Sequence, residues 1–277
     1  MIMTDYPSNI TDNQWNSIEN FFDPDKRKRK HPLIEIMNAI LYTLVSGCQW
    51  RMLPKDFPPY NTVYYYFRKW KYEGSFEQAM FELHQTVRVA AGREESPSLG
   101  IIDSRSNRTS NHVDTDKGLD GNKKVKGRKI HICVDILGLP LAIVIHAANI
   151  ADCVGAELVF NEMIDRFPRL KAILADGGYR GDSVANCAKK HGWKLNVVLR
   201  PDECPKKFIV LPKRWIVERT FSWLEKCRRL TSDFEYFANS AQAMVQVAFI
   251  RLMLNRFIGY NQNSFLLFLS SIKKRNL

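Results

Sequence analysis

The sequence predicts an α/β protein in which a mixed sheet is flanked by helices and preceded by an all-helical region. Two observations predict this fold class. Residues 11–92 have the spacing of apolar residues that is typical of helices. From residue 99 onward, three strand-like segments follow one another, and then helical and strand-like segments alternate. A chain of 277 residues with 45% hydrophobic residues is long enough for one large domain and a smaller one.

The expected helical region, residues 1–92, contains three helical runs. The first, TDNQWNSIENFF, offers Thr11 or Asp12 as an N-cap, and the second, PLIEIMNAILYTLVSG, begins at a proline and ends at Gly47. The third, TVYYYFRKWKYEGSFEQAMFELHQTV, mixes aromatic and basic residues behind a turn that contains proline. This mixture suits a helix that reads DNA, because cations bind phosphates while an apolar side packs in the core. The alternative is that the aromatic side chains only pack.

Residues 93–98 have the composition of a linker, and residues 99–260 are expected to form the second domain. Its first strand candidate is LGIID, and KGRKIHICVDILGLPLAIVIHAAN has the pattern of two strands joined by a Gly/Pro turn. The further elements expected are a helix at 153–166, a strand at 171–176, a helix at 182–191, a strand at 193–200 and a long helix at 212–230. The tail, residues 261–277, is either a docked helix or a frayed end.

The charge balance points to a polyanionic partner. There are 41 Lys and Arg residues against 29 Asp and Glu residues, which gives a net charge of +12 spread over several segments. Nucleic acid is the leading candidate for that partner. The alternative is an enzyme that is basic for no functional reason.

Composition also excludes several classes of protein. The six cysteines include no CxxC pair and no matching histidine spacing, so neither a zinc site nor a disulfide framework is indicated. The N-terminus lacks the pattern of a signal peptide, and no segment has the ~18 uninterrupted apolar residues of a membrane span. The closest, AMVQVAFIRLMLNRF, fits a packed helix better. We therefore expect a cytoplasmic protein with no membrane partner.

Two aspartates end strand candidates. Asp103 ends LGIID and Asp176 ends AILAD, and Gly177 and Gly178 follow the second of them. If these strands are neighbours, both carboxylates meet at one edge of the sheet, where like charges need a compensating cation such as a divalent metal ion. The two glycines would let a substrate approach the backbone. The alternative is that each acid only caps a loop.

A third acid lies in LPKRWIVERTFSWLEKCRRL. On a helical wheel Glu218 flanks an apolar stripe, and such a carboxylate is costly to bury unless it is paired or bound to metal. An ordinary ion pair with Arg214, four residues earlier, explains it equally well. Together Asp103, Asp176 and Glu218 have the composition of an oxygen-ligand site for two Mg²⁺ or Mn²⁺ ions. Two such ions clamp the attacking and leaving oxygens of a phosphoryl displacement.

At these residues the sequence resembles the DDE transposases of bacterial insertion sequences, specifically the insertion-sequence-five group. The resemblance runs across nearly the whole chain and includes several motifs in order. They are LYTLVSGCQWRMLPKDFPPYNTVYYYFRKW, IIDSRSNR, KKVKGRKIHICVDILGLPLAIVIHAANIADCVGA, ILADGGYRGD and LPKRWIVERTFSWLEKCRRL, of which the last is the most specific.

The resemblance implies an RNase H-like catalytic fold and a helix-turn-helix-like DNA-binding domain at the N-terminus. It implies that Asp103, Asp176 and Glu218 hold two metal ions. The implied reaction is hydrolysis at the element's ends to free a 3′-hydroxyl, which then attacks target DNA. The implied partner is double-stranded DNA in the nucleoid of a bacterial cytosol, bound by a homodimer or larger assembly that brings two ends together.

Eight basic residues are the expected DNA contacts: Arg68, Lys69, Lys71, Lys126, Arg128, Arg214, Arg219 and Lys226. The chain departs from the wider superfamily's pattern, in which Tyr and Lys stand where this sequence has Leu211 and Glu225. Asp152 also resembles a recurrent family position, but helix N-capping explains it. Asp135 is assigned to a hairpin turn.

An active transposase is the leading hypothesis. One alternative is a repressor that keeps the fold and the DNA affinity without the chemistry. Another is a host-adopted nuclease that cuts DNA without strand transfer.

Overall fold

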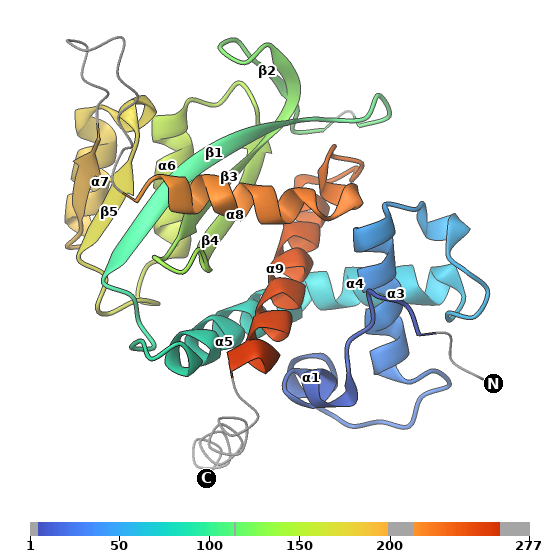
Figure 1. Cartoon of the computed structure of the whole chain (residues 1–277). Coiled ribbons are helices and arrows are strands. Elements are labelled where there is room, and N and C mark those ends of the chain that lie inside the picture. Colours follow the sequence, from blue (N-terminus) through green and yellow to red (C-terminus); the bar gives the residue numbers. More distant parts are fainter. Residues whose placement is uncertain (1–4, 114, 199–212, 261–277) are drawn as a thin grey trace.

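The computed structural model describes residues 5–113, 115–198 and 213–260. Figure 1 shows a helical N-terminal part beside a curled sheet, with one long helix, α9, running between them. The N-terminal elements are α1 (Asp12–Asn16), α2 (Glu19–Phe22), α3 (Leu33–Ser46), the 3₁₀ turn η1 (Trp50–Met52), α4 (Tyr60–Tyr72) and α5 (Ser75–Ala90).

Local sequence explains most of these helix boundaries. Thr11 caps α1 through a reciprocal capping box with Gln14, as expected of a Thr followed three residues later by Gln. Gly47 ends α3 in the left-handed conformation. The third helical run was expected to be continuous, and this was wrong: Gly74, at φ 75°, separates α4 from α5.

In the described part of the chain the sheet has six strands: β1 (Leu99–Arg108), β2 (Gly118–Asp120), β3 (Val125–Val134), β4 (Pro140–Ala147), β5 (Ala172–Ala175) and β6 (Lys194–Val197). Their order is β2-β3-β1-β5-β6, and β4 pairs with β3. Strand β3 runs antiparallel to both β1 and β4. Strand β5 runs parallel to β1, and β6 runs parallel to β5. This confirms the expected mixed sheet and sets β1 beside β5.

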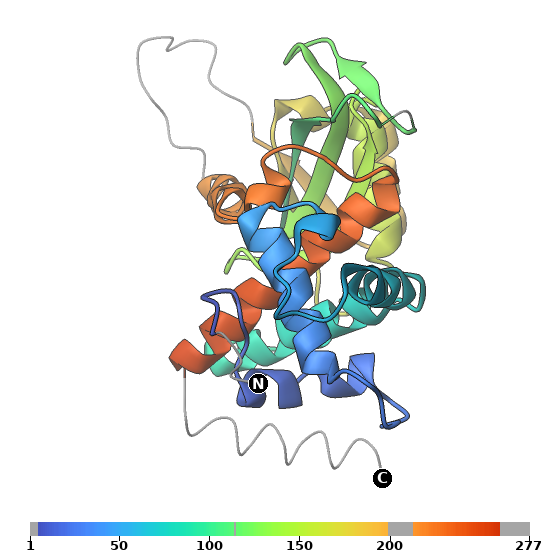
Figure 2. The ribbon, with the colours of Figure 1, turned by 90° about the vertical axis from the view of Figure 1, so that its right-hand side faces the viewer.

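Helices cover both faces of the sheet. On one face α6 (Asp152–Glu162) and α7 (Asp182–Lys190) pack on residues such as Ile102 and Cys133. On the other face α8 (Trp215–Glu225) and α9 (Ala238–Tyr260) pack on residues such as Ile101 and Ile132. The two sets alternate along β1 because successive strand residues point to opposite faces. In Figure 2 the orange α8 lies on the opposite side of the green strands from α6.

One apolar cluster joins the helical part to the sheet. It extends from α3 and α5, through the buried side chains of α9 such as Phe249 and Met253, to the inner residues of β3 and β4. The segment AMVQVAFIRLMLNRF is therefore a packed helix, as expected. None of the helices in the described ranges combines the length and the apolar character that a bilayer span requires.

Some expected boundaries were wrong. The first strand candidate extends to Arg108, because its outer half still pairs with β3. The helix expected at 212–230 ends at Glu225, and a 3₁₀ turn, η3 (Arg228–Leu230), follows it. The short strand β2 was not expected. Residues 199–212, with the ends of two expected elements, and the tail 261–277 lie outside the described residues.

Candidate active site

Asp103 and Asp176 stand on neighbouring parallel strands. In the register of β1 and β5, Ile101 lies opposite Leu174, so a continuation by two residues brings Asp103 opposite Asp176. Asp103 accepts a 2.8 Å hydrogen bond from the backbone N–H of Ser104. Asp176 is the N-cap of a 3₁₀ turn, η2 (Gly177–Tyr179), and accepts a 2.9 Å bond from the N–H of Gly178. Asp103 lies within β1 and not at its end, where it was expected, whereas Asp176 directly follows the neighbouring strand β5.

The electrostatics of this pair disfavour two ionised acids. Burial is the main cause that raises the pKa of Asp103 to about 6, and the nearby charge of Asp176 acts in the same direction. The backbone hydrogen bond from Ser104 and the positive charges of Arg214 and Lys123 act in the opposite direction. An acid that is left short of donors beside a second acid is typical of a functional site.

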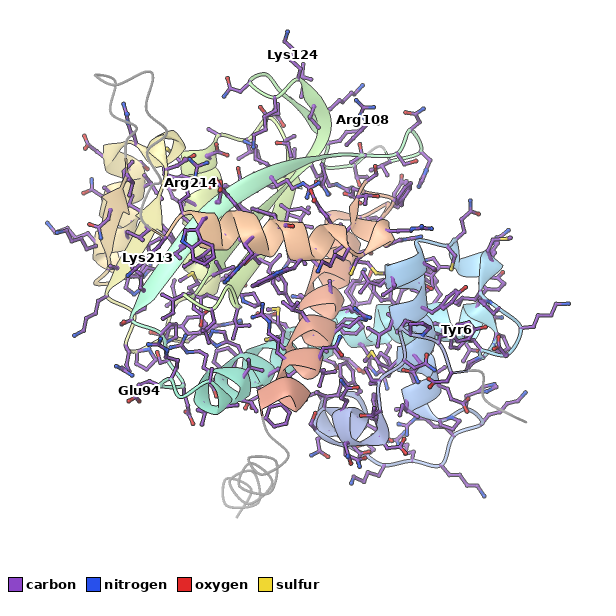
Figure 3. All side chains as sticks on the ribbon, viewed as in Figure 1. Tyr6, Glu94, Arg108, Lys124, Lys213 and Arg214 are labelled. Carbon is purple, nitrogen blue, oxygen red and sulfur yellow. The ribbon has the colours of Figure 1, made fainter. Side chains whose placement is uncertain are left out.

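Glu218 is joined to the aspartates through Arg214. Arg214 precedes α8, and Figure 3 shows it at the start of that helix beside β1. Its Nε atom lies 3.4 Å from Oε1 of Glu218, and its Nη2 atom lies 3.4 Å from Oδ2 of Asp176. The ion pair with Glu218 was expected from the spacing of four residues. The contact with Asp176 was not, because it depends on how α8 packs on the sheet.

The donor set suits a hard cation. Across the described ranges no group of three His, Cys, Asp or Glu side chains lies close enough together to hold a metal ion. Instead, the guanidinium of Arg214 contacts Asp176 and Glu218, and its charge partly opposes the rise in the pKa of Asp103. Three carboxylates that share one positive charge have the oxygen ligands that Mg²⁺ and Mn²⁺ prefer. The chemical type of these three side chains therefore fits a divalent ion, although their present spacing does not form a ligand group.

Asp152 was wrongly assigned to N-capping. The N-cap of α6 is Ala151, which has no side-chain cap bond, and Asp152 is the first helical residue. Its Oδ1 atom accepts 2.9 Å bonds from Ser104 Oγ and from Nζ of the buried Lys129. Burial alone would raise the pKa of Asp152, but these two donors outweigh it and lower that pKa.

Gly178 lies between two of the carboxylates. A Cβ atom added there would stand 3.1 Å from Oδ1 of Asp176 and 3.3 Å from Oδ2 of Asp152. Asp152 is thus a fourth carboxylate at this site, which the sequence reasoning set aside. Its resemblance to a recurrent family position was the signal that could have identified it.

A buried chain of hydrogen bonds lies beneath the carboxylates. Tyr179 Oη lies 2.6 Å from Nε2 of His131, and His131 Nδ1 lies 3.0 Å from Nε2 of His146. Because His146 Nδ1 must donate to the carbonyl of Ala147, each imidazole accepts on Nε2, and the tyrosine hydroxyl donates to His131. Burial and the neighbouring His146 lower the pKa of His131 to about 3, so both rings stay neutral. This chain ties the turn after Asp176 to β3 and β4.

The expected DNA contacts have different surroundings. Arg128 is fully buried, and its guanidinium donates to Asp233 and to backbone carbonyls including those of Thr115 and Glu235. This corrects the expectation that Arg128 contacts DNA, because a guanidinium enclosed by acceptors cannot reach a phosphate. Lys71 donates to Asn239 and Ser240 of α9.

The other expected contacts lie nearer the surface. Arg219 is stacked between the rings of Trp215 and Trp223, 4.6 Å from each ring centroid. Lys69 contacts Glu73, its neighbour one turn later. The side chains of Arg68, Lys126 and Lys226 are exposed. Asp135, assigned to a turn, does accept the N–H groups of that turn.

Comparison with known families agrees with this architecture. Residues 94–253 match a family model described as the transposase DDE domain. The chain belongs to the DDE transposase family. Its N-terminal residues 10–80 match a second model, described as “Putative transposase of IS4/5 family”. The resemblance seen in the motifs is thereby confirmed, and with it the RNase H-like class of the sheet.

The chain is also similar to a protein from Burkholderia cepacia. That protein is described as “Putative transposase for insertion sequence element IS402” and is 31% identical over 138 residues. The match covers 46% of this chain and 60% of the relative's length.

Proposed function

We propose that the protein is a DNA transposase that binds the ends of an insertion sequence and catalyses metal-dependent cleavage and strand transfer. The observation that carries the proposal is the meeting of Asp103 and Asp176 on parallel strands, with Arg214 linking Asp176 to Glu218. Membership of the DDE transposase family supports the same conclusion.

In this proposal Asp103, Asp176 and Glu218 hold two Mg²⁺ or Mn²⁺ ions. When bound, such ions stabilise the charge on the attacking and leaving oxygens of a phosphoryl transfer. The chain's own contribution is to orient these carboxylates. The backbone bonds from Ser104 and Gly178 do this for the two aspartates. Gly178 carries no side chain, which leaves room for a DNA backbone beside Asp176.

Arg214 has two roles in the proposal. Without metal its guanidinium offsets the charge of the carboxylates, which it contacts at 3.4 Å. Once a divalent ion supplies that charge, the guanidinium can turn to a DNA phosphate, which Arg binds well through its planar set of donors. Arg219 and the exposed Arg68, Lys126 and Lys226 are proposed as further phosphate contacts.

The remaining features follow from the same reaction. Residues 1–92 would bind the element's ends, and residues 99–260 would perform the chemistry. A homodimer or larger assembly would bring two ends together on the DNA of a bacterial nucleoid. The net charge of +12 suits such a partner.

A cleavage assay tests the proposal. Labelled DNA that carries candidate element ends is mixed with protein and Mg²⁺, and the wild type is compared with Asp176→Asn and Glu218→Gln. We expect the wild type to cut the DNA and both variants to bind without cutting. Lys190→Gln, an exposed lysine at the end of α7 with no role in the proposal, is the matched control and should cut normally.

Two outcomes would contradict parts of the proposal. If wild type and variants all bind and none cuts, the catalytic assignment fails and a repressor remains. If the wild type cuts but never joins its product to a target plasmid, a nuclease remains. DNA binding should also weaken steeply with salt, because phosphate neutralisation releases counterions.

A further inference from the structure

A cleft lies where the helical part meets the far end of β1. Its volume is about 740 Å³, and its walls come from η1 and α4 on one side and from the segments after β1 and η3 on the other. This is within the range of about 300–1,000 Å³ that is typical of small-molecule sites. None of the described residues that line it takes part in the proposed catalysis.

Aromatic rings are exposed to this cleft. Tyr60 is 41% exposed, Tyr64 is 38% exposed and Phe234 is 41% exposed, and all three line the cleft. The aromatic residues Phe67 and Trp70 of the same helix are fully buried. Helix α4 therefore buries one aromatic face and presents another to an open space.

The cleft has a rigid wall. Arg229 is only 8% exposed, and its guanidinium donates to Glu235 and to the carbonyl of Cys48. The same guanidinium lies 5.8 Å from the ring centroids of Trp50 and of Phe234. Because this arginine joins the helical part to the segment after η3, the rings on both sides are held in place before any ligand arrives.

The remaining charge at the cleft is positive. Arg51 lies at its rim, with the guanidinium carbon 5.9 Å from the ring centroid of Tyr60. His112 and Ser110 contribute polar groups, and no described residue of the lining is acidic. Exposed rings beside cations are the combination that binds single-stranded nucleic acid, since bases stack and phosphates are neutralised.

We propose that this cleft binds an unstacked nucleobase of a DNA strand. The base stacks on the rings of Tyr60, Tyr64 and Phe234, and the adjoining phosphate faces Arg51. The inference rests on the proposed function, because it takes DNA as the substrate, and it adds a subsite that recognises unpaired rather than paired DNA. Stacking of this kind tolerates any base, because every base has a π-face.

The position of the cleft relates the base to the reacting phosphate. Ser110 follows Asp103 by seven residues along and just beyond β1. Seven extended residues span at most about 24 Å, and a DNA duplex rises about 3.4 Å per base pair. The wall of the cleft at Ser110 is therefore at most about 24 Å from Asp103, which corresponds to about seven base pairs of duplex DNA.

Binding of two labelled DNAs tests the inference. One is a thymidine oligonucleotide of about eight residues, a length within the site sizes of single-strand binding proteins, and the other is a perfectly paired duplex. We expect Tyr64→Ala to weaken binding of the oligonucleotide about tenfold, the measured effect of losing one stacked ring, and to leave duplex binding unchanged. Tyr64→Phe should retain oligonucleotide binding because it keeps the ring.

A neighbouring tyrosine provides the matched control. Tyr65 is 61% exposed on the same helix but does not line the cleft, so Tyr65→Ala should not change binding of either DNA. The salt dependence should be the same for Tyr64→Ala as for wild type, since a ring releases no counterions. For Arg51→Ala it should become shallower, because a phosphate contact is lost.

The outcomes separate the two proposals. If Tyr64→Ala and Tyr65→Ala weaken oligonucleotide binding equally, or if neither does, the cleft does not bind a base, while normal duplex binding and cleavage would keep the transposase proposal intact. If wild-type protein binds neither DNA, the proposed function itself fails, and the cleft proposal fails with it.

Discussion

The pKa values of two aspartates, Asp103 and Asp135, are shifted in opposite directions. Asp103 in β1 receives one backbone hydrogen bond and faces Asp176, and its pKa is raised to about 6, chiefly by burial. Asp135, in the turn between β3 and β4, is fully buried, yet its pKa is lowered. Burial raises that pKa too, but His84, the N–H of Leu139 and the guanidinium of Arg88 together outweigh it.

The difference lies in the number of donors that the fold supplies. Asp135 Oδ1 accepts the N–H groups of Leu137 and Leu139, and Oδ2 contacts the guanidinium of Arg88. Within the described ranges, the Asp103 carboxylate accepts its hydrogen bond from the N–H of Ser104. A buried acid with all its acceptors occupied stabilises a fold, whereas one left short of donors next to another acid is available to bind a cation.

The largest effect is expected from Asp103→Asn. Loss of one metal ligand should reduce DNA cleavage about 10³-fold or more, because bound ions supply several kcal/mol of transition-state stabilisation. The same change should raise the melting temperature at pH 7.5, since it removes a charge that burial disfavours. Cleavage rates and thermal melts of one preparation check both. Loss of activity together with loss of stability would remove the contrast with Asp135.

Asp135→Ala, in contrast to Asp103→Asn, should lower the stability of the protein. It leaves the buried Arg88 without its acid, and removal of one partner of a buried ion pair costs about 3–5 kcal/mol of unfolding free energy. Urea denaturation measures this cost. Asp25→Ala, in an exposed pair with Arg27, is the control and should cost about 1 kcal/mol or less. A small cost at Asp135 with selective loss of cleavage would show that the turn acid is functional.

The pH dependence should distinguish the two acids as well. The pKa of Asp103 is about 6 in the folded protein, against an ordinary value of 3.8 for an aspartate in an unfolded chain. Its contribution to stability is therefore complete below about pH 3.8 and is lost as the pH rises through about 6. We expect Asp103→Asn to match wild type in unfolding free energy near pH 4 and to exceed it by about 3 kcal/mol above pH 6.5. A difference that is constant with pH would refute the raised pKa.

Gly155→Ala tests the support beneath the carboxylates of the candidate site. An added Cβ would stand 2.3 Å from Nδ1 of His131 and 2.6 Å from Nε2 of His146. We expect the variant to lose about 1–3 kcal/mol from overpacking, although alanine ordinarily favours a helix. Gly121→Ala, with no atom within 4 Å of its added Cβ, should change stability by about 0.5 kcal/mol or less. Equal effects would mean that α6 can move away from the histidines.

The smallest effect on stability is expected from Arg214→Gln. Its ion pairs at 3.4 Å are partly exposed, with Glu218 56% exposed, and such pairs contribute only a few tenths of a kcal/mol. Because Arg214 supplies the charge that a metal ion would replace, the variant should gain more melting temperature from Mg²⁺ than wild type does. A calorimetric melt with and without Mg²⁺ measures this gain. An equal gain would mean that Arg214 and the metal do not compete.

The sequence alone determined most of the segments that become strands and helices. Apolar segments on the two sides of a Gly/Pro turn identified β3 and β4, and Pro32 and Gly47 bounded α3. These signals are local, since they depend on residues within one or two turns. The break at Gly74 was also visible as a glycine. This break was missed because the segments before and after Gly74 both have the pattern of a helix.

Only the tertiary structure decided what each charged group faces. Local sequence assigned Asp135 to a turn, but it could not show that Asp135 is buried against Arg88, nor exclude the buried Arg128 as a DNA contact. Local sequence also could not show that Asp152 accepts a hydrogen bond from Ser104, or that Arg214 contacts Asp176. These contacts join residues tens of positions apart, and the electrostatic state of a buried group depends on its neighbours in space. The strands were therefore predictable from the chain, whereas the ionisation of the acids they carry depended on the packed sheet.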